Sequence, residues 1–275
     1  VGITWGKTLF SIVEELAKAS PPDGFSRKMR FIPLCGEATD FSVAEHSATS
    51  LSARLNYWAS PANGQPDPDQ FLALTATPAR LSSKLESPDI DVIRNFIRLS
   101  RSYALIFGDE HGEHELLTSR TEPLAKIVDT ILTSAGSIYR DRDDVFIRDL
   151  RKVEFDREDV SDLELAERVT NHIIGDVGGY FLPRRWPNRD ESAKVADDIN
   201  SRWTGVKLEH LELCAARARG TARPGVILPA CGPEKSEIII EAVRLGIINI
   251  LIIDDRLADE ILRIAKRDGW LDVEV

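Results

Sequence analysis

The sequence predicts an α/β protein with a mostly parallel sheet flanked by helices. Short apolar runs alternate with amphipathic segments along the chain, which is the strand and helix order of this class. The run IINILII at 247–253 is almost wholly apolar, which is typical of a parallel strand that helices cover on both faces. With 275 residues, 43% of them hydrophobic, the chain has ample material for a core.

The N-terminal part of the chain contains most of the clear alternation. Helical spacing of apolar residues, proline and glycine stops and strand-length apolar runs define its elements. The expected elements are a strand at 1–3, a helix opening near Thr8 and ended by Pro21 and Pro22, a strand at 30–34, a helix at 47–59, a helix at 90–102 and a strand at 103–107 that stops at Gly108.

The C-terminal part repeats the pattern after a charged middle segment. Residues 120–170 mix charges of both signs around few apolar residues, which is typical of a surface layer, and 115–170 is a possible insertion in a single domain spanning 1–275. The expected elements are a strand with glycine interruptions at 172–182, a loop at 183–191, a strand at 225–229, a helix at 234–245, a buried strand at 247–253 and a last helix opening at Asp254.

The opening VGITWGKTL contains GKT after an apolar run, but it is not a nucleotide-binding P-loop. That motif needs a glycine five residues before Gly6, where the chain has Val1. A helix start nevertheless exposes unpaired N–H groups and the positive end of the helix dipole. The turn at 4–8 is therefore a candidate anion site of a more general kind.

Four turns follow predicted strands, at 4–8, 35–39, 108–112 and 230–235. The carboxyl ends of parallel strands meet at one edge of the sheet, and ligands of open α/β sheets bind there. We expect these four turns to gather at one rim.

Several segments resemble the effector domain, called the sugar-binding domain, of SorC/DeoR-type bacterial transcriptional regulators. The segments are VGITWGKTL, IPLCGE, ALIFG, IIGDVGGYFL and ILPACGPEKSEIIIEAVRLGIINILIIDDRLADEIL. The resemblance implies a fold like that of sugar-phosphate isomerases and coenzyme A transferases, and a small, usually phosphorylated, sugar as ligand. It also implies an N-terminal helix-turn-helix domain upstream of this chain and homodimers or homotetramers that bind operator DNA.

The resemblance also implies which residues bind the ligand. Trp5, Gly6, Lys7 and Thr8 fall where the family holds a phosphate, Asp176 where an acid accepts hydrogen bonds from sugar hydroxyls, and Lys235 where a lysine reaches the ligand. The second and third turns add Gly36, Glu37, Gly108 and Asp109.

Both of these turns depart from the family pattern by carrying carboxylates. Glu37 follows Cys35 and Gly36 where a glycine pair is usual, and Asp109 follows Gly108 where Gly-Ile-Gly is usual. Two like charges 4 Å apart repel by roughly 4 kcal/mol at an effective dielectric of about 20. An unphosphorylated sugar or polyol therefore stays open beside a sugar phosphate.

Composition excludes other classes of function. A net charge of −10 makes this stretch by itself a poor nucleic-acid binder, so any contact with DNA belongs to the upstream domain. Three widely spaced cysteines indicate a reducing cytoplasm, and no apolar run approaches the roughly 20 residues of a membrane helix. We expect no cofactor and no metal, because the DEHGEH segment at 109–114 lacks a metal-binding pattern and reads as a solvated loop.

Other readings of the same residues stay open. The chain is expected not to be an enzyme, but a sugar-phosphate isomerase or deaminase with Asp109 or Glu110 as general base is the alternative, and a domain without a ligand is a third. Asp176 could pair with an arginine at a glycine bend, and Lys7 and Lys235 could be solvated. Residues 184–186, Arg-Arg-Trp, could form a lid or a surface loop.

Overall fold

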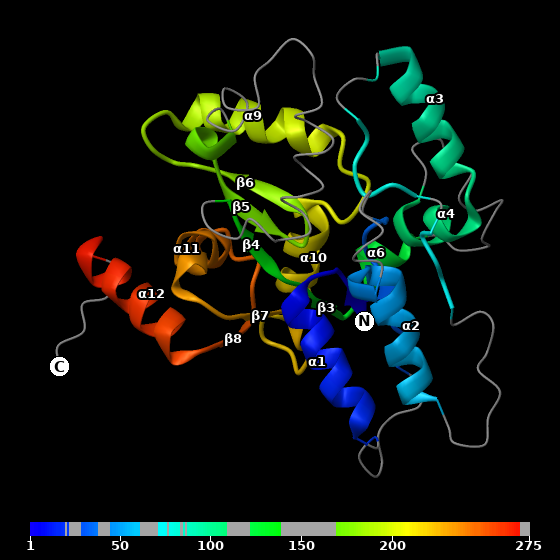
Figure 1. Ribbon diagram of the computed structural model, residues 1–275, viewed down its shortest axis with the longest axis horizontal. Coiled ribbons are helices and arrows are strands. Elements are labelled where there is room, and N and C mark those ends of the chain that lie inside the picture. Colours follow the sequence, from blue (N-terminus) through cyan, green and yellow to red (C-terminus); the bar gives the residue numbers. More distant parts are fainter. Residues whose placement is uncertain are drawn as a thin grey trace.

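The structure is a computed structural model that describes residues 1–19, 21, 29–37, 45–60, 71–75, 77–82, 85, 87–108, 122–138 and 169–269 (Figure 1). Within these ranges, no helix has both the length and the apolar character needed to span a membrane.

The centre of the molecule is a five-stranded parallel sheet with the order β2-β1-β3-β7-β8. Its strands are β1 (Gly2–Ile3), β2 (Ile32–Pro33), β3 (Thr130–Leu132), β7 (Gly225–Ala230) and β8 (Ile250–Ile253). This confirms the predicted α/β class with a parallel sheet.

Helices cover both faces of this sheet (Figure 1). On one face, α1 (Lys7–Lys18) and α2 (Ala48–Ala59) enclose a cluster that includes Ile3, Leu9 and Leu55. On the other face, α6 (Leu124–Ile127), α10 (Leu208–Ala218) and α11 (Ser236–Arg244) pack around Ile131 and Val226. Successive strand residues therefore alternate between two cores, as the pleat of a strand requires.

A second, three-stranded antiparallel sheet lies against the first. It consists of β4 (Ala135–Ser137), β5 (Ile173–Val177) and β6 (Tyr180–Pro183), and α9 (Arg189–Ser201) packs on β6. Only Thr133 and Ser134 separate β3 from β4, so the second sheet begins where β3 ends. The chain ends its described part with α12 (Asp255–Arg267), which follows β8.

The predicted strand at 103–107 is wrong. This segment is the helix α4 (Arg101–Phe107), and α3 (Ser87–Arg98) precedes it in place of one longer helix. Ala104 and Ile106 of α4 are buried, and the rings of Tyr103 and Phe107, one helical turn apart, lie 5.0 Å from each other. A five-residue apolar run fits either structure, and packing against α6 decides for the helix.

Two further expectations for strands are corrected. The segment 172–182 is a hairpin of β5 and β6, whose turn is Gly178 and Gly179, and not one interrupted strand. The run 247–253 is not buried throughout, because β8 is an edge strand with Ile250 and Ile252 exposed. Part of the possible insertion, residues 124–138, supplies α6, the central strand β3 and β4, so this part belongs to the core.

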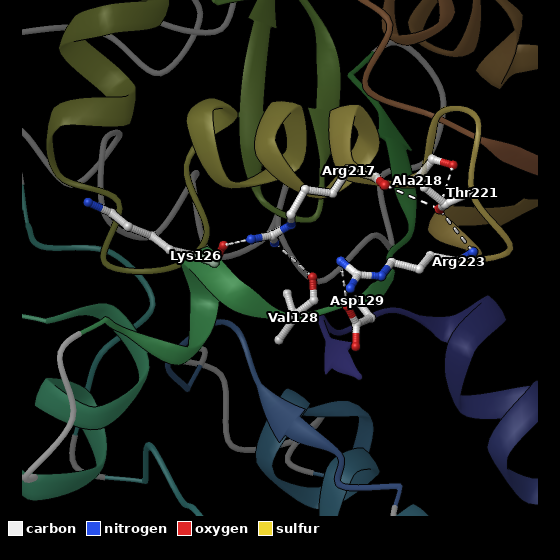
Figure 2. A network of polar contacts seen from close by, with 7 residues as sticks. All are labelled: Lys126, Val128, Asp129, Arg217, Ala218, Thr221 and Arg223. Carbon is white, nitrogen blue, oxygen red and sulfur yellow. Dashed lines mark hydrogen bonds and ion pairs between the residues drawn. The ribbon is translucent and has the colours of Figure 1, made fainter.

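Side chains also tie the amino edge of the sheet together (Figure 2). Arg217 of α10 donates to the carbonyl oxygens of Lys126 and Val128, the second at 2.9 Å, where α6 ends and the chain turns into β3. Arg223, just before β7, pairs with Asp129, just before β3, at 3.2 Å. Side-chain hydrogen bonds and an ion pair therefore hold together the amino edge of the sheet.

Candidate functional site

The sheet order places a topological switch point between β1 and β3. The chain runs from β1 outward to β2 on one side, whereas β3, β7 and β8 continue on the other side. In open α/β sheets, ligands bind beyond the carboxyl ends of the strands at such a switch point.

Three segments converge at this point. The Thr4 hydroxyl after β1 donates to the Thr133 hydroxyl after β3 at 3.2 Å, and the Ser134 hydroxyl donates to the Trp5 carbonyl at 2.6 Å. The hairpin joins them because the Gly178 N–H donates to the Ser134 carbonyl at 2.9 Å. The post-strand segments of β1 and β3 and the β5–β6 turn therefore form one connected unit.

Glycine is required at both close approaches in this unit. A β-carbon on Gly6, whose φ is 142°, would lie 2.7 Å from the Ser134 hydroxyl oxygen. A β-carbon on Gly178, whose φ is 61°, would lie 2.6 Å from the Thr133 hydroxyl oxygen. Any larger residue would push the turns apart.

The N-terminus of α1 opens at this unit without a side-chain cap. Gly6 is the cap residue and has no side chain that could accept a hydrogen bond from the first turn, and no acidic residue lies in that turn. Lys7 is exposed and Thr8 is half-buried, whereas the Trp5 side chain is fully buried among Cys35, Ala79 and other residues. The helix end thus has the N–H groups and positive dipole that suit an anion.

Asp176 of β5 is fully buried beside the hairpin turn. Its Oδ2 accepts a hydrogen bond from the Gly179 N–H at 2.8 Å. The Gly179 carbonyl in turn accepts from the guanidinium of Arg80 at 3.3 Å, and that guanidinium lies over the rings of Phe181 and Trp203. The glycine bend is therefore held by a carboxylate on one side and a buried cation on the other.

Gly36 and Glu37 follow β2 at the same edge of the sheet. Gly36 is buried, and a β-carbon there would lie 2.2 Å from the Thr77 carbonyl oxygen, while Glu37 bridges to Pro78. Burial raises the pKa of Glu37, and hydrogen bonds from Thr49 and Ser47 at the start of α2 counteract it.

Lys235 lies after the carboxyl end of β7, in the short 3-10 helix Pro233–Lys235. It is buried, and this helix packs against β4 and α12. Asp254, which follows β8, lies near Lys235 and accepts from the N–H groups of Leu257 at 2.8 Å and Gly232 at 2.9 Å. These bonds, the one from Leu257 first, lower the pKa of Asp254.

The predicted site residues are thus partly brought together. The turns at 4–8, 35–39 and 230–235 follow strands as expected, in their described residues. Asp176 is the register partner of Gly136 of β4, and the 3-10 helix that contains Lys235 also packs against β4. The turn at 108–112 was wrongly expected to follow a strand, because Gly108 ends α4 and has Pro123 as its close neighbour. Asp109 lies outside the described residues.

The sequence interpretation missed Arg80, Thr133 and Ser134, and it did not single out Thr4 within the turn at 4–8. The Thr-Ser pair follows the apolar run TIL and precedes Ala135 and Gly136, but it lies in the charged middle segment whose elements were not placed. Arg80 has no local signal, because its role depends on rings from β6 and from the connection after α9.

Residues 184–186 behave as a surface loop in the structure. Arg184 pairs with Glu237 at 3.3 Å and Arg185 with Glu241 at 2.8 Å, both on α11, and the Trp186 side chain is 82% exposed. The arginines thus hold the loop to α11.

No family model matches the sequence, and no curated protein sequence matches it. Solved structures do share its fold. A DeoR family transcriptional regulator from Listeria monocytogenes aligns with a TM-score of 0.56 at 19% identity, over 94% of this chain and 78% of that one. The full-length sorbitol operon regulator SorC from Klebsiella pneumoniae aligns with a TM-score of 0.57 at 20% identity, over 95% of this chain and 64% of that one.

A third similar structure is a domain, described as sugar-binding, of a transcriptional repressor from Vibrio fischeri. It aligns with a TM-score of 0.56 at 18% identity, over 96% of this chain and 79% of that one. These neighbours are transcriptional regulators and not enzymes, and the expected resemblance to SorC/DeoR effector domains is confirmed at the level of the fold.

Proposed function

We propose that this chain is the ligand-sensing domain of a bacterial transcriptional regulator, which binds a small sugar, polyol or sugar phosphate at the switch point between β1 and β3. The observation that carries the proposal is the junction of three turns beside Asp176. This junction lies at the switch point of the parallel sheet, in a fold that the chain shares with transcriptional regulators. A carboxylate accepts well from vicinal hydroxyls, and an uncapped helix end suits an anionic or electron-rich group.

Several of the predicted ligand-binding residues have a role in this proposal. Gly6, Lys7 and Thr8 bind the anionic or polar end at the start of α1, Asp176 accepts from hydroxyls, and Lys235 donates from the 3-10 helix that packs against β4. A sugar phosphate and a polyol are both candidate ligands, and the sorbitol operon regulator among the similar structures supports the polyol.

Binding then controls DNA through an attached helix-turn-helix. The ligand must bind two arrangements of a homodimer or homotetramer with different affinity, which shifts the population that holds the operator. We place this function in the cytoplasm. A reading frame with no helix-turn-helix upstream of Val1 would contradict this part and leave ligand binding untouched.

A thermal unfolding screen against sugars, polyols and their phosphates tests the ligand part. A ligand at 100 times its dissociation constant stabilises by about 2.7 kcal/mol, which raises the melting temperature of a domain of this size by roughly 5 °C or more. No stabilisation by any member of the three classes would refute ligand sensing of this kind.

The variant Asp176→Asn keeps an oxygen that accepts the Gly179 N–H and removes the charge. We expect it to bind the best ligand at least tenfold more weakly. Asp129→Asn is the matched control, because that carboxylate is exposed at the amino edge of the sheet and should leave binding unchanged. Equal binding by wild type and Asp176→Asn would show that another group accepts the hydroxyls.

A further inference from the structure

The two edges of the parallel sheet differ in how they are protected from further pairing. β2 forms one edge, where α2 packs against a strand of two buried residues that include Pro33. β8 forms the other edge with four apolar residues, Ile250–Ile253, and it pairs with β7 in an unbroken register. Prolines, charged side chains and bulges keep an edge strand from pairing with another chain. β8 contains none of these three features, so its edge favours pairing.

The side chains of β8 lie at the less covered end of a row that crosses the sheet. Strand register aligns the members of this row, which are Ile3, Leu132, Ile227 and Ile250. Their exposure rises from 0% at Ile3, under α1 and α2, to 40% at Ile250, and Ile252 on the same face is 55% exposed. The next helix, α12, packs against α11 and the 3-10 helix. Parallel strands are normally covered on both faces, so one face of β8 lacks its cover among the residues that the structure describes.

The two ends of β8 carry opposite charges. At its carboxyl end, three carboxylates lie with one guanidinium, and these residues are Asp254, Asp255, Asp259 and Arg256. At its amino end, the exposed Arg219 donates to the Gly246 carbonyl at 2.8 Å, and the exposed Arg223 precedes β7 and pairs with Asp129. Two copies of β8 in antiparallel order bring the acidic end of each strand to the basic end of the other. Parallel order would bring like charges together.

We propose that β8 is an interface between two copies of this chain, which pair antiparallel through their β8 strands about a two-fold axis perpendicular to the sheet. The pairing joins two five-stranded sheets into one and gives both copies the same contacts, as a closed dimer requires. The exposed Ile250 and Ile252 of both strands then lie on one face and cover one another across the axis.

This interface deepens the proposed function, on which it rests for its role in the regulator. β8 ends at Asp254, whose carboxylate accepts a hydrogen bond from the Gly232 N–H at 2.9 Å. Gly232 precedes the 3-10 helix that contains Lys235, one of the residues proposed to bind the ligand. A ligand held by Lys235 therefore acts on a turn that is bonded directly to the end of the interface strand.

Sedimentation equilibrium of the whole chain, without ligand, tests the interface. We expect a dimer, and we expect Ile252→Lys to weaken dimerisation tenfold or more, because it brings two ammonium groups together near the axis. Val92→Lys is the matched control, since Val92 is a β-branched residue, 67% exposed, on α3, which lies far from β8 in Figure 1. This control should change the dissociation constant of the dimer less than twofold.

A charge exchange tests the antiparallel order. Asp255→Arg and Arg219→Glu should each weaken the dimer severalfold, because each places like charges at both ends of the interface. The chain that carries both substitutions should recover most of the affinity, which a variant that had lost its fold could not do. Failure of the two substitutions to compensate would refute antiparallel pairing through β8.

Two other results would overturn the proposal. A chain that stays monomeric at submillimolar concentration would leave the edge to another occupant. A dimer that Ile252→Lys weakens no more than Val92→Lys does would move the oligomer of the proposed function to another surface. The thermal screen with sugars and polyols stays independent of both results, since it measures ligand binding in each variant by itself.

Discussion

At the scale of single residues, the structure places several ionisable groups where their charge is unfavourable. His210 is one of them, because it is buried in the first turn of α10 and its Nδ1 accepts a hydrogen bond from the Lys207 N–H at 3.0 Å. Burial lowers the pKa of His210 to about 4, although Glu209 acts in the opposite direction. The folded protein therefore requires the neutral imidazole.

His210 should make the fold acid-sensitive. Between pH 6.5 and about 4 the unfolded chain protonates this histidine and the folded chain does not, so stability is present above pH 6.5 and is lost as the pH falls. The difference amounts to about 3 kcal/mol, at about 1.4 kcal/mol per pKa unit. His210→Gln retains an acceptor for the helix start and should lose less stability. Urea unfolding at pH 7 and 4.5 measures this, and equal losses in both proteins would contradict it.

At the scale of elements, the β5–β6 hairpin couples the second sheet to the turns that follow β1 and β3. Gly178 lies between Thr4 and Thr133, so a β-carbon there meets atoms 2.6 Å and 2.8 Å away. Gly220 has a similar positive φ of 71° and no atom within 4 Å of such a β-carbon. A comparison of substitutions at these two glycines therefore distinguishes the cost of a left-handed backbone from the cost of a steric clash.

Replacing each glycine by alanine should give different losses of stability. Gly220→Ala pays only for the left-handed backbone, about 1 kcal/mol, whereas Gly178→Ala also forces apart the hairpin and the turns and should cost about 2–4 kcal/mol. Gly178→Ala should also reduce the ligand-induced shift in melting temperature. Chemical denaturation with and without ligand checks both effects. Equal losses in the free energy of unfolding for the two variants would mean that the hairpin shifts to accommodate the β-carbon without cost.

The same elements show how far sequence reasoning reached. The block of β7, the 3-10 helix and α11 was predicted well, because an apolar strand, a glycine turn and an amphipathic helix follow one another there. The Gly178-Gly179 pair is a two-residue hairpin signal that was read as an interruption of one strand. The strand at 103–107 failed because a short apolar run has no period long enough to distinguish strand from helix.

From the residues alone, the candidate site was predictable only where its signal is local. The turn at 4–8 was predicted as a candidate because a helix start follows a strand directly, whereas Gly36 and Lys235 were named from the resemblance to SorC/DeoR effector domains. Arg80 could not be predicted, since its place is set by Phe181, Trp203 and the Gly179 carbonyl, which are distant in sequence. Thr133 and Ser134 became candidate site residues only once β3 proved to be the central strand.

At the scale of the whole molecule, the two edges of the parallel sheet have different tasks. The carboxyl edge holds turns, glycines and an uncapped helix, whereas direct bonds tie α6, α10 and the strand starts at the amino edge (Figure 2). A substitution at the amino edge should therefore lower the free energy of unfolding without changing the affinity for the ligand.

Arg217→Met tests this separation. It removes the guanidinium donors to the Lys126 and Val128 carbonyls, and bonds from a charged donor contribute about 1.5–3 kcal/mol. We expect a loss of about 2–3 kcal/mol in urea unfolding, with the affinity for sugar or polyol unchanged. Arg223→Met is the control, because its pair with Asp129 is exposed and should contribute less than about 1 kcal/mol. A weaker ligand affinity in Arg217→Met would show that the amino edge takes part in sensing.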